Sequence, residues 1–352
     1  MTILAEHSAI HFSAPPDAYA HSPVEERGLP RDRVRLLVAG ADGIRHACFR
    51  DLPEQLRAGD VVVVNDSATV AGQLDAELAK HGPIVVHLAT PLEDGTWVVE
   101  LRTAPDAGRA VLDAEPGDLV TAGPVTITLL EPYPYRSSPT GSGNRLWRVR
   151  ASHPLEPYAA AHGRPIAYGY LDRAYPLTAY QTVFATVPGS AEMPSAARPF
   201  TTDIVTRLVS RGIAVAPVTL HTGVSSQEAG EGPQPERFRV PEATARLVTA
   251  ARAGGGRVVA VGTTVTRALE SAVDDAGRLV ARSGWTERVV TPAHPPRIVT
   301  GLITGWHDPA ASHLLLVEAV AGAVLAQRAY DAAVAEGYLW HEFGDSALFL
   351  PG

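Results

Sequence analysis

The sequence predicts an α/β protein with a mostly parallel sheet that carries helices on both faces and is interrupted by a small β-barrel. Three observations indicate this class. From about residue 195 onward, apolar strand-like runs alternate with segments of helical periodicity, a pattern typical of a parallel sheet covered by helices. Between about residues 70 and 153, short strand-like runs recur without helical periodicity, which favours a small closed barrel. The length of 352 residues suffices for two domains.

The predicted domain boundaries follow these changes of pattern. Residues 1–68 and 154–352 are expected to form a discontinuous α/β domain, and residues 69–153 to form the inserted barrel domain. In the first segment, the apolar runs at residues 34–38 and 60–66 are predicted strands. The barrel is predicted to contain strands at residues 70–78, 84–89, 97–101, 125–130 and 146–149.

The C-terminal segment is predicted to alternate helices and strands. Four consecutive apolar residues at 258–261 indicate a strand buried on both faces, and the three glycines at 254–256 are expected to end the helix before it. The predicted helices lie at residues 202–210, 242–253, 264–273 and 314–335, and the predicted strands lie at residues 213–220, 258–261, 302–304 and 347–350.

The composition excludes several classes of function. Lys80 is the only lysine, so there is no P-loop lysine in a glycine-rich context, and a Schiff-base mechanism would depend on this one residue. The single cysteine, Cys48, excludes an internal disulfide and a cysteine-rich zinc site. The net charge of −8 argues against a broad nucleic-acid surface, although a local arginine patch is compatible with it.

The sequence also predicts a cytoplasmic protein. No run approaches the roughly 18 apolar residues of a membrane span. The first residues lack the basic region and the apolar core of a signal peptide. The sequence does not predict an oligomeric state.

Polar residues follow four of the predicted strands in the α/β domain. Because ligands bind beyond the carboxyl ends of parallel strands, these residues are predicted to share one edge of the sheet. They are Asn65, Asp66, His221, Thr222, Gly262, Thr263, Thr264, His307 and Asp308. Each also has a structural explanation, such as an Asx turn at Asn65, a satisfied buried histidine at His221 or a helix N-cap at Asp308.

The turn at residues 262–264 joins a predicted strand to a predicted helix. Its glycine would allow close approach of a ligand, its threonines can cap the helix, and the helix start offers unpaired N–H groups to a carboxylate or phosphate. An ordinary strand-to-helix turn is the alternative, because one glycine is a weaker signal than a G-x-G-x-x-G motif. Neither metal-ligand spacing nor a Gly-x-Ser-x-Gly motif occurs, so the pattern predicts a polar site without a metal.

A series of motifs runs in order along nearly the whole chain. It comprises residues 31–38, 49–52, 59–66, 180–185, 189–190 with Pro194, 200–201, 218–223, 259–264 with 267–271, 302–304 with His307 and Pro309, and 344–345. Together these motifs resemble the S-adenosylmethionine:tRNA ribosyltransferase-isomerase family of queuosine biosynthesis. The resemblance implies an α/β domain interrupted by a small β-barrel, which agrees with the prediction from periodicity.

The resemblance also implies an activity and a set of site residues. Members of the family transfer and rearrange the ribosyl part of S-adenosylmethionine onto the aminomethyl group of a 7-deazaguanine in tRNA, and release adenine and methionine without a metal or other cofactor. An imidazole suits removal of the C5′ proton beside the sulfonium. At positions that match the family pattern, the catalytic candidates are His221, His307, Asp66 and Asp345, and the candidates for binding S-adenosylmethionine are Asn65, Thr222, Gly262, Thr263, Thr264 and Arg267.

The sequence departs from the family pattern in the centres of several motifs. The arginine that usually follows Asn-Asp is lost, with Ala68 in its place, and a later motif loses a histidine and gains Arg198. Three functions therefore stay open: the tRNA reaction, a reaction of S-adenosylmethionine alone or with a small-molecule acceptor, and non-catalytic binding of a nucleoside or of tRNA. In favour of tRNA, Arg198, Arg207 and Arg211 are predicted to form a basic strip for phosphates.

Overall fold

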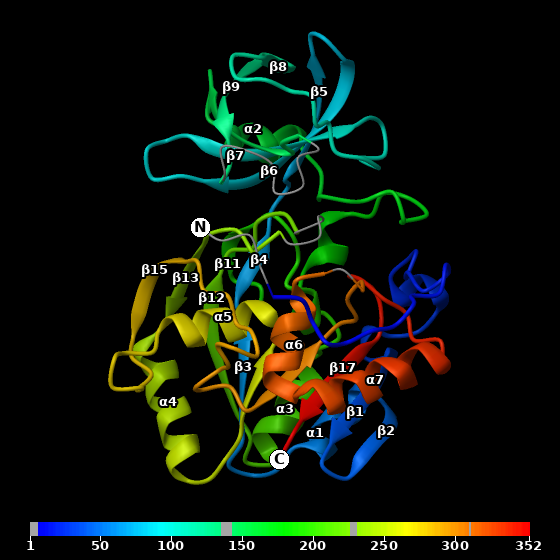
Figure 1. The fold of residues 1–352 in the computed structure, drawn as a ribbon, viewed down its shortest axis with the longest axis vertical. Helices are drawn as coiled ribbons and strands as arrows, with labels where there is room; N and C mark the ends of the chain where they lie inside the picture. Colours follow the sequence, from blue (N-terminus) through cyan, green and yellow to red (C-terminus); the bar gives the residue numbers. More distant parts are fainter. Residues whose placement is uncertain (1–5, 135–142, 226–230, 310) are drawn as a thin grey trace.

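The structure is a computed structural model that describes residues 6–134, 143–225, 231–309 and 311–352. A large α/β part carries a smaller β-barrel at one end (Figure 1). The first five residues, on which the expectation about a signal peptide partly rests, lie outside the described residues. Among the helices that are described, none is long and apolar enough to cross a membrane.

A nine-stranded mixed sheet forms the α/β part. Its strands lie in the order β15 (Arg282–Thr286), β13 (Glu236–Val240), β12 (Ala214–Leu220), β3 (Val61–Asn65), β14 (Val258–Val261), β16 (Gly301–Thr304), β17 (Ser346–Leu350), β1 (Arg35–Gly40) and β2 (Gly43–Cys48). The four central strands β12, β3, β14 and β16 are parallel. Strand β17 is antiparallel to β16 and parallel to β1, and the strands at both edges are antiparallel. The carboxyl ends of the four central strands therefore share one edge, as predicted.

Helices cover both faces of the sheet because side chains alternate between the faces along each strand. Val61 and Val63 of β3 pack on one face with helices α4 (Glu242–Ala253), α5 (Thr263–Ser271), α6 (His313–Ala321) and α7 (Ala323–Ala335). Val62 and Val64 pack on the other face with α1 (Leu52–Gln55) and α3 (Thr202–Ser210). Among the described residues, the α/β part also contains five short 3-10 helices: Val24–Arg27, Arg31–Arg33, Phe49–Asp51, Leu177–Tyr180 and Ser195–Ala197. The predicted fold class is confirmed.

The prediction of one long helix over residues 314–335 is wrong. The segment contains two helices, α6 and α7, which meet at Gly322. Gly322 has a φ of 76°, a left-handed value that ends α6. Apolar residues continue on both sides of this glycine, so the hydrophobic pattern alone gave no sign of the break.

The barrel is closed and antiparallel. It contains β5 (Gln73–Leu78), β6 (Gly82–Pro91), β7 (Trp97–Thr103), β8 (Leu119–Ala122), β9 (Val125–Pro132) and β10 (Leu146–Ala151), in the order β10-β7-β6-β5-β8-β9. Strand β8 is the barrel strand that the sequence analysis did not predict. Helix α2 (Leu155–His162) packs Leu155 and Ala159 into the barrel core. The boundaries 1–68, 69–153 and 154–352 stay a prediction.

A buried network of charges links the barrel to the α/β part. The guanidinium of Arg145, just before β10, contacts Glu100 of β7 at 2.8 Å and Glu231 at 2.7 Å. Glu100 also contacts Arg102 at 2.7 Å and His87 at 3.3 Å. Burial by itself would raise the pKa of Glu100, but the surrounding positive charges outweigh this effect and lower the pKa to about 2. The strands β4 (Ser67–Thr69) and β11 (Val187–Ser190) pair beside the chain's entry into the barrel.

Candidate active site

A cavity of about 760 Å³ lies beyond the carboxyl ends of β12, β14 and β16. The barrel completes its wall with Arg102, Asp106 and Gly108. Six of the predicted site residues line this cavity: Thr222, Gly262, Thr263, Thr264, Arg267 and His307. These six residues therefore lie around one cavity at the predicted edge of the sheet, and such an edge is where α/β proteins commonly bind ligands.

The turn between β14 and α5 forms part of the cavity wall. Gly262 is the N-cap of α5, and its φ of 91° is a value that favours glycine. The expectation that a threonine caps this helix is wrong, because both threonines lie inside the first turn of α5. Within the described residues, the N–H groups of Thr263 and Thr264 donate to no protein group. These donors are available to a ligand in the cavity.

Arg267, one turn further along α5, lines the cavity but is strongly engaged by the protein. Its guanidinium pairs with Glu236 and donates to the carbonyl oxygens of Gln234, Thr286 and Arg288. Burial raises the pKa of Glu236, and the charge of Arg267 opposes that effect. Arg267 therefore ties the start of β13 to the end of β15 and the residues just after it, beside the cavity.

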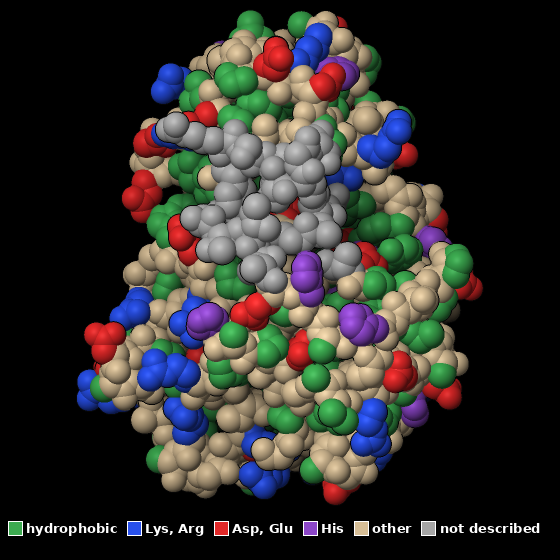
Figure 2. Space-filling view, viewed as in Figure 1, with side chains coloured by type: hydrophobic (Ala, Val, Ile, Leu, Met, Phe, Trp, Pro, Cys, Tyr) green, Lys and Arg blue, Asp and Glu red, His purple; other side chains and the backbone are tan. Residues whose placement is uncertain are grey.

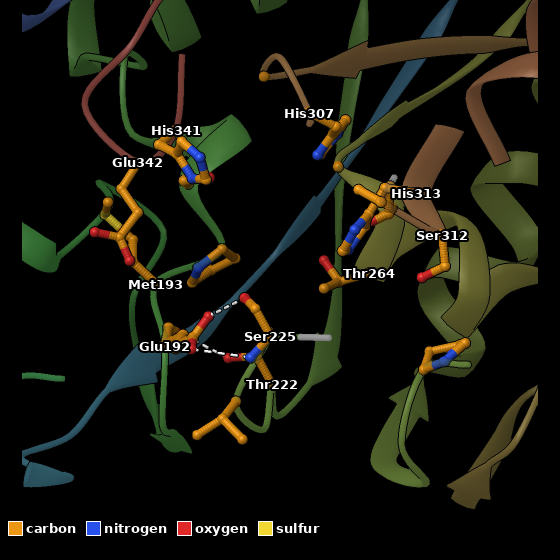
Figure 3. A pocket seen from close by; sticks show the side chains of 18 of the residues that line it. Glu192, Met193, Thr222, Ser225, Thr264, His307, Ser312, His313, His341 and Glu342 are labelled. Atoms are coloured by element: carbon orange, nitrogen blue, oxygen red, sulfur yellow. Dashed lines mark hydrogen bonds between the residues drawn. The ribbon is translucent and has the colours of Figure 1, made fainter. Parts of the chain in front are cut away.

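Two histidines stack on one side of the cavity (Figure 3). The ring centroids of His307 and His313 lie 4.7 Å apart with nearly parallel planes, and His307 Nε2 lies 3.0 Å from the Thr304 hydroxyl. Burial is the main reason that the pKa of His307 falls well below its usual value and that the pKa of His313 falls to about 4. Both rings are therefore neutral near pH 7, and each has a nitrogen that can accept a proton.

Asn65 lies behind the cavity wall rather than in it. Its side chain is fully buried and bonds the backbone of Leu220 at 2.8 and 3.0 Å. It also donates to the Thr264 hydroxyl at 3.4 Å. Asn65 therefore fixes the ends of β3 and β12 relative to the turn that lines the cavity.

His221 and Asp66 also lie outside the cavity wall. His221 Nδ1 bonds the Ser67 hydroxyl at 2.8 Å, and its ring fills the space beside Gly189, where a Cβ would approach it to 2.6 Å. Burial lowers the pKa of His221. Asp66 accepts a hydrogen bond from Thr219 at 2.6 Å. The hydrogen bond of His221 matches the structural alternative that the sequence left open for it. The Asx turn forms at Asn65, whose Oδ1 accepts a hydrogen bond from the Ser67 N–H at 3.1 Å.

Asp345 is held away from the cavity by an ion pair with Arg35. Its carboxylate accepts hydrogen bonds from the Arg35 backbone N–H and guanidinium at 2.7 to 2.9 Å, and from the Leu339 N–H at 2.8 Å. It connects the start of β1 to the turn before β17.

Several cavity residues were not predicted. They are Tyr19, Tyr168, Tyr170, Glu192, Glu236, His313, His341 and Glu342. Most come from irregular segments, to which a rule about the ends of strands does not apply. The repeated aromatic pattern at residues 168–170 and the adjacent His341 and Glu342 were the available signals.

The structure contradicts the predicted basic strip at Arg198, whereas Arg211 is exposed. Arg198 is buried, contacts Glu25 at 3.0 Å and donates to a backbone carbonyl. Arg207 pairs with Glu54 at 2.7 Å. On the face shown in Figure 2, Lys and Arg side chains are scattered over the α/β part and do not form one continuous patch.

The fold and the cavity define an α/β protein with a polar cavity at the carboxyl edge of its sheet, whose wall is completed by an inserted barrel. A family model described as "Queuosine biosynthesis protein" matches residues 7–349. The S-adenosylmethionine:tRNA ribosyltransferase-isomerase of Acidiphilium cryptum is 35 % identical, and the match covers 96 % of this chain and 97 % of that protein. The enzyme of the same name from Thermus thermophilus is also 35 % identical, with coverage of 97 % and 99 %.

A solved structure of an enzyme with a closely similar name also matches this chain. The S-adenosylmethionine tRNA ribosyltransferase of Thermotoga maritima matches with a TM-score of 0.54 and 26 % identity, over 97 % of this chain and 100 % of that one. The chain belongs to the S-adenosylmethionine:tRNA ribosyltransferase-isomerase family of queuosine biosynthesis.

Proposed function

We propose that this enzyme transfers and isomerises the ribosyl part of S-adenosylmethionine onto 7-aminomethyl-7-deazaguanine in tRNA, and releases adenine and methionine. The observation that carries the proposal is the family match along nearly the whole chain, together with a large cavity where the family's motifs meet. S-adenosylmethionine is a co-substrate in this reaction, and tRNA is the acceptor. That no metal takes part stays a prediction.

The cavity offers groups suited to removal of the C5′ proton and to binding of the donor. The positive sulfonium makes the neighbouring C5′ hydrogen acidic, and the neutral imidazole of His307 is placed in the wall to accept that proton. The N–H groups at Thr263 and Thr264 suit the donor's carboxylate or ribose oxygens. Asn65 supports Thr264 from behind, so its proposed role is positioning.

The deciding experiment is turnover with S-adenosylmethionine and a tRNA that carries 7-aminomethyl-7-deazaguanine, run beside the free base. Modified tRNA and released adenine are the expected products. Adenine release without tRNA binding, even at low salt, would instead favour a small-molecule acceptor or a reaction of the donor alone. Binding without any release would favour a non-catalytic protein.

Replacement of Thr263 by valine tests the turn of α5. Valine keeps the shape of threonine and removes its hydroxyl, so we expect the affinity for S-adenosylmethionine to fall by roughly 1–3 kcal/mol, the cost of leaving a polar partner unsatisfied. Calorimetry measures this change. Unchanged affinity in both Thr263→Val and Thr264→Val would remove these hydroxyls from the donor site.

A further inference from the structure

Two carboxylates, Glu192 and Glu342, share one side of the cavity, opposite His307 and His313 (Figure 3). In the part of the chain that the structure describes, neither carboxylate forms an ion pair with a lysine, an arginine or a histidine. Glu192 is buried and Glu342 is partly buried, and the charge of Glu192 disfavours the ionised form of Glu342. A positive ligand beside them would relieve this repulsion.

Glu192 is held rigidly. Its carboxylate accepts hydrogen bonds from the Tyr168 hydroxyl and from both the hydroxyl and the backbone N–H of Ser225. These three contacts fix the side chain beside the end of β12. The carboxyl group of Glu192 therefore has a fixed position in the wall of the cavity.

Glu342 has fewer partners. The Tyr170 hydroxyl donates to its Oε2 at 3.0 Å, and no other donor to Glu342 is found within the described residues. Burial raises the pKa of Glu342 to about 8, and the charge of Glu192 adds to the increase. The Tyr170 hydrogen bond and the charge of the nearby Arg198 oppose it. Near neutral pH, Glu342 can therefore both take up and release a proton.

Aromatic rings lie beside these carboxylates. Tyr170 and His341 stack with centroids 5.0 Å apart, and Tyr19 lies 4.6 Å from His341 and 5.7 Å from Tyr170. All three residues line the cavity. Carboxylates next to aromatic faces suit a ligand that joins an ammonium group to a flat ring.

We propose that Glu192 and Glu342 form the subsite for the acceptor's aminomethyl group, and that Glu342 removes a proton from its ammonium form. The inference rests on the proposed function. The N–H bond breaks, its electron pair stays on nitrogen, and the proton passes to a Glu342 oxygen. The lone pair can then form the bond from nitrogen to a carbon of the unsaturated sulfonium that remains when adenine departs. The π bond at that carbon breaks, and its electron pair moves to the carbon beside the sulfur. An ammonium nitrogen has no lone pair for this step.

The expected contribution of Glu342 to the rate follows from the pKa of the acceptor's amine. A primary aliphatic ammonium has a pKa of about 10, so only a small fraction of roughly 10⁻² to 10⁻³ is neutral at pH 7 to 8. A positioned base typically contributes roughly 10²- to 10⁴-fold to a rate. Because the free enzyme must carry ionised Glu342, kcat/KM for the tRNA should rise with pH through a midpoint near 8 and level off above it.

The test is the pH profile of kcat/KM for Glu342→Gln with the tRNA carrying 7-aminomethyl-7-deazaguanine. We expect a loss of roughly 10²-fold or more at pH 7.5, because glutamine keeps the size but cannot accept the proton. The loss should shrink towards pH 10, where the amine is neutral without help. Affinity for S-adenosylmethionine should stay the same. Glu242→Gln, at an exposed position at the start of α4, is the matched control and should leave rate and profile unchanged.

Two further variants move the midpoint in opposite directions and keep the test informative if Glu342→Gln folds poorly. Tyr170→Phe removes a donor that lowers the pKa of Glu342, so the midpoint should move to higher pH. Glu192→Gln removes the neighbouring negative charge, so the midpoint should move to lower pH. If the unsubstituted enzyme carries out the transfer, either of two results overturns the subsite alone. The pH profile of kcat/KM is unchanged in Glu342→Gln, or Tyr170→Phe and Glu192→Gln do not shift its midpoint in opposite directions. No transfer by the unsubstituted enzyme overturns the proposed function and the subsite with it.

Discussion

Replacement of Arg145 by methionine should lower the free energy of unfolding by about 3–5 kcal/mol, the typical cost of removing one member of a buried ion pair. Arg145 is 4 % exposed and lies between two buried carboxylates, Glu100 and Glu231. Methionine fills much of the same volume but leaves those carboxylates without the cation between them. Urea unfolding followed by circular dichroism measures the change.

Arg148→Met is the matched control, because Arg148 lies in β10, three residues after Arg145, but pairs with Asp94 and Glu131 at the surface. Exposed ion pairs contribute about 0–1 kcal/mol, so this variant should unfold at nearly the same urea concentration as the unsubstituted protein. Equal losses in the two variants would mean that burial of the network does not matter for stability.

Replacement of His307 by glutamine should slow turnover by roughly 10²-fold or more and leave donor binding largely intact, because glutamine cannot act as a general base. Exchange of the C5′ hydrogen with deuterated solvent measures the step directly. Since the pKa of His307 lies well below 6.5, its ring is unprotonated at pH 6.5 and above, and protonation of His307 should cause no loss of rate between pH 6.5 and 8.

His221→Gln is the comparison for this variant, because His221 lies outside the cavity wall. We expect it to retain C5′ exchange. Exchange at the unsubstituted rate in His307→Gln, with loss of exchange in His221→Gln, would assign proton removal to His221 instead.

The part of the site that the sequence predicted is the part governed by regular structure. Gly262, Thr263 and Thr264 could be placed because parallel strands bring their carboxyl ends to one edge, whatever the details of packing. The same rule could not distinguish Thr264, which lines the cavity, from Asn65, one layer behind it. That difference depends on how side chains pack, which strand order does not determine.

The acidic side of the cavity could not be predicted in this way. Glu192 and Glu342 are 150 positions apart in the sequence and both lie in irregular segments. They meet because of tertiary packing around Tyr168 and Tyr170. Arg198 shows the opposite error, since an arginine gained in a motif suggested a surface for phosphates, whereas in the structure it is buried against Glu25.

Strand β17 has a consequence for the order of folding. It fills the position between β16 and β1, and Asp345 beside it bonds Arg35, 310 positions away. Such a distant contact requires a large loop to close before it gives any stabilisation, so we expect it to form late and to slow folding. Until β17 inserts, β16 and β1 each present an unpaired edge, which is where misfolded chains would associate.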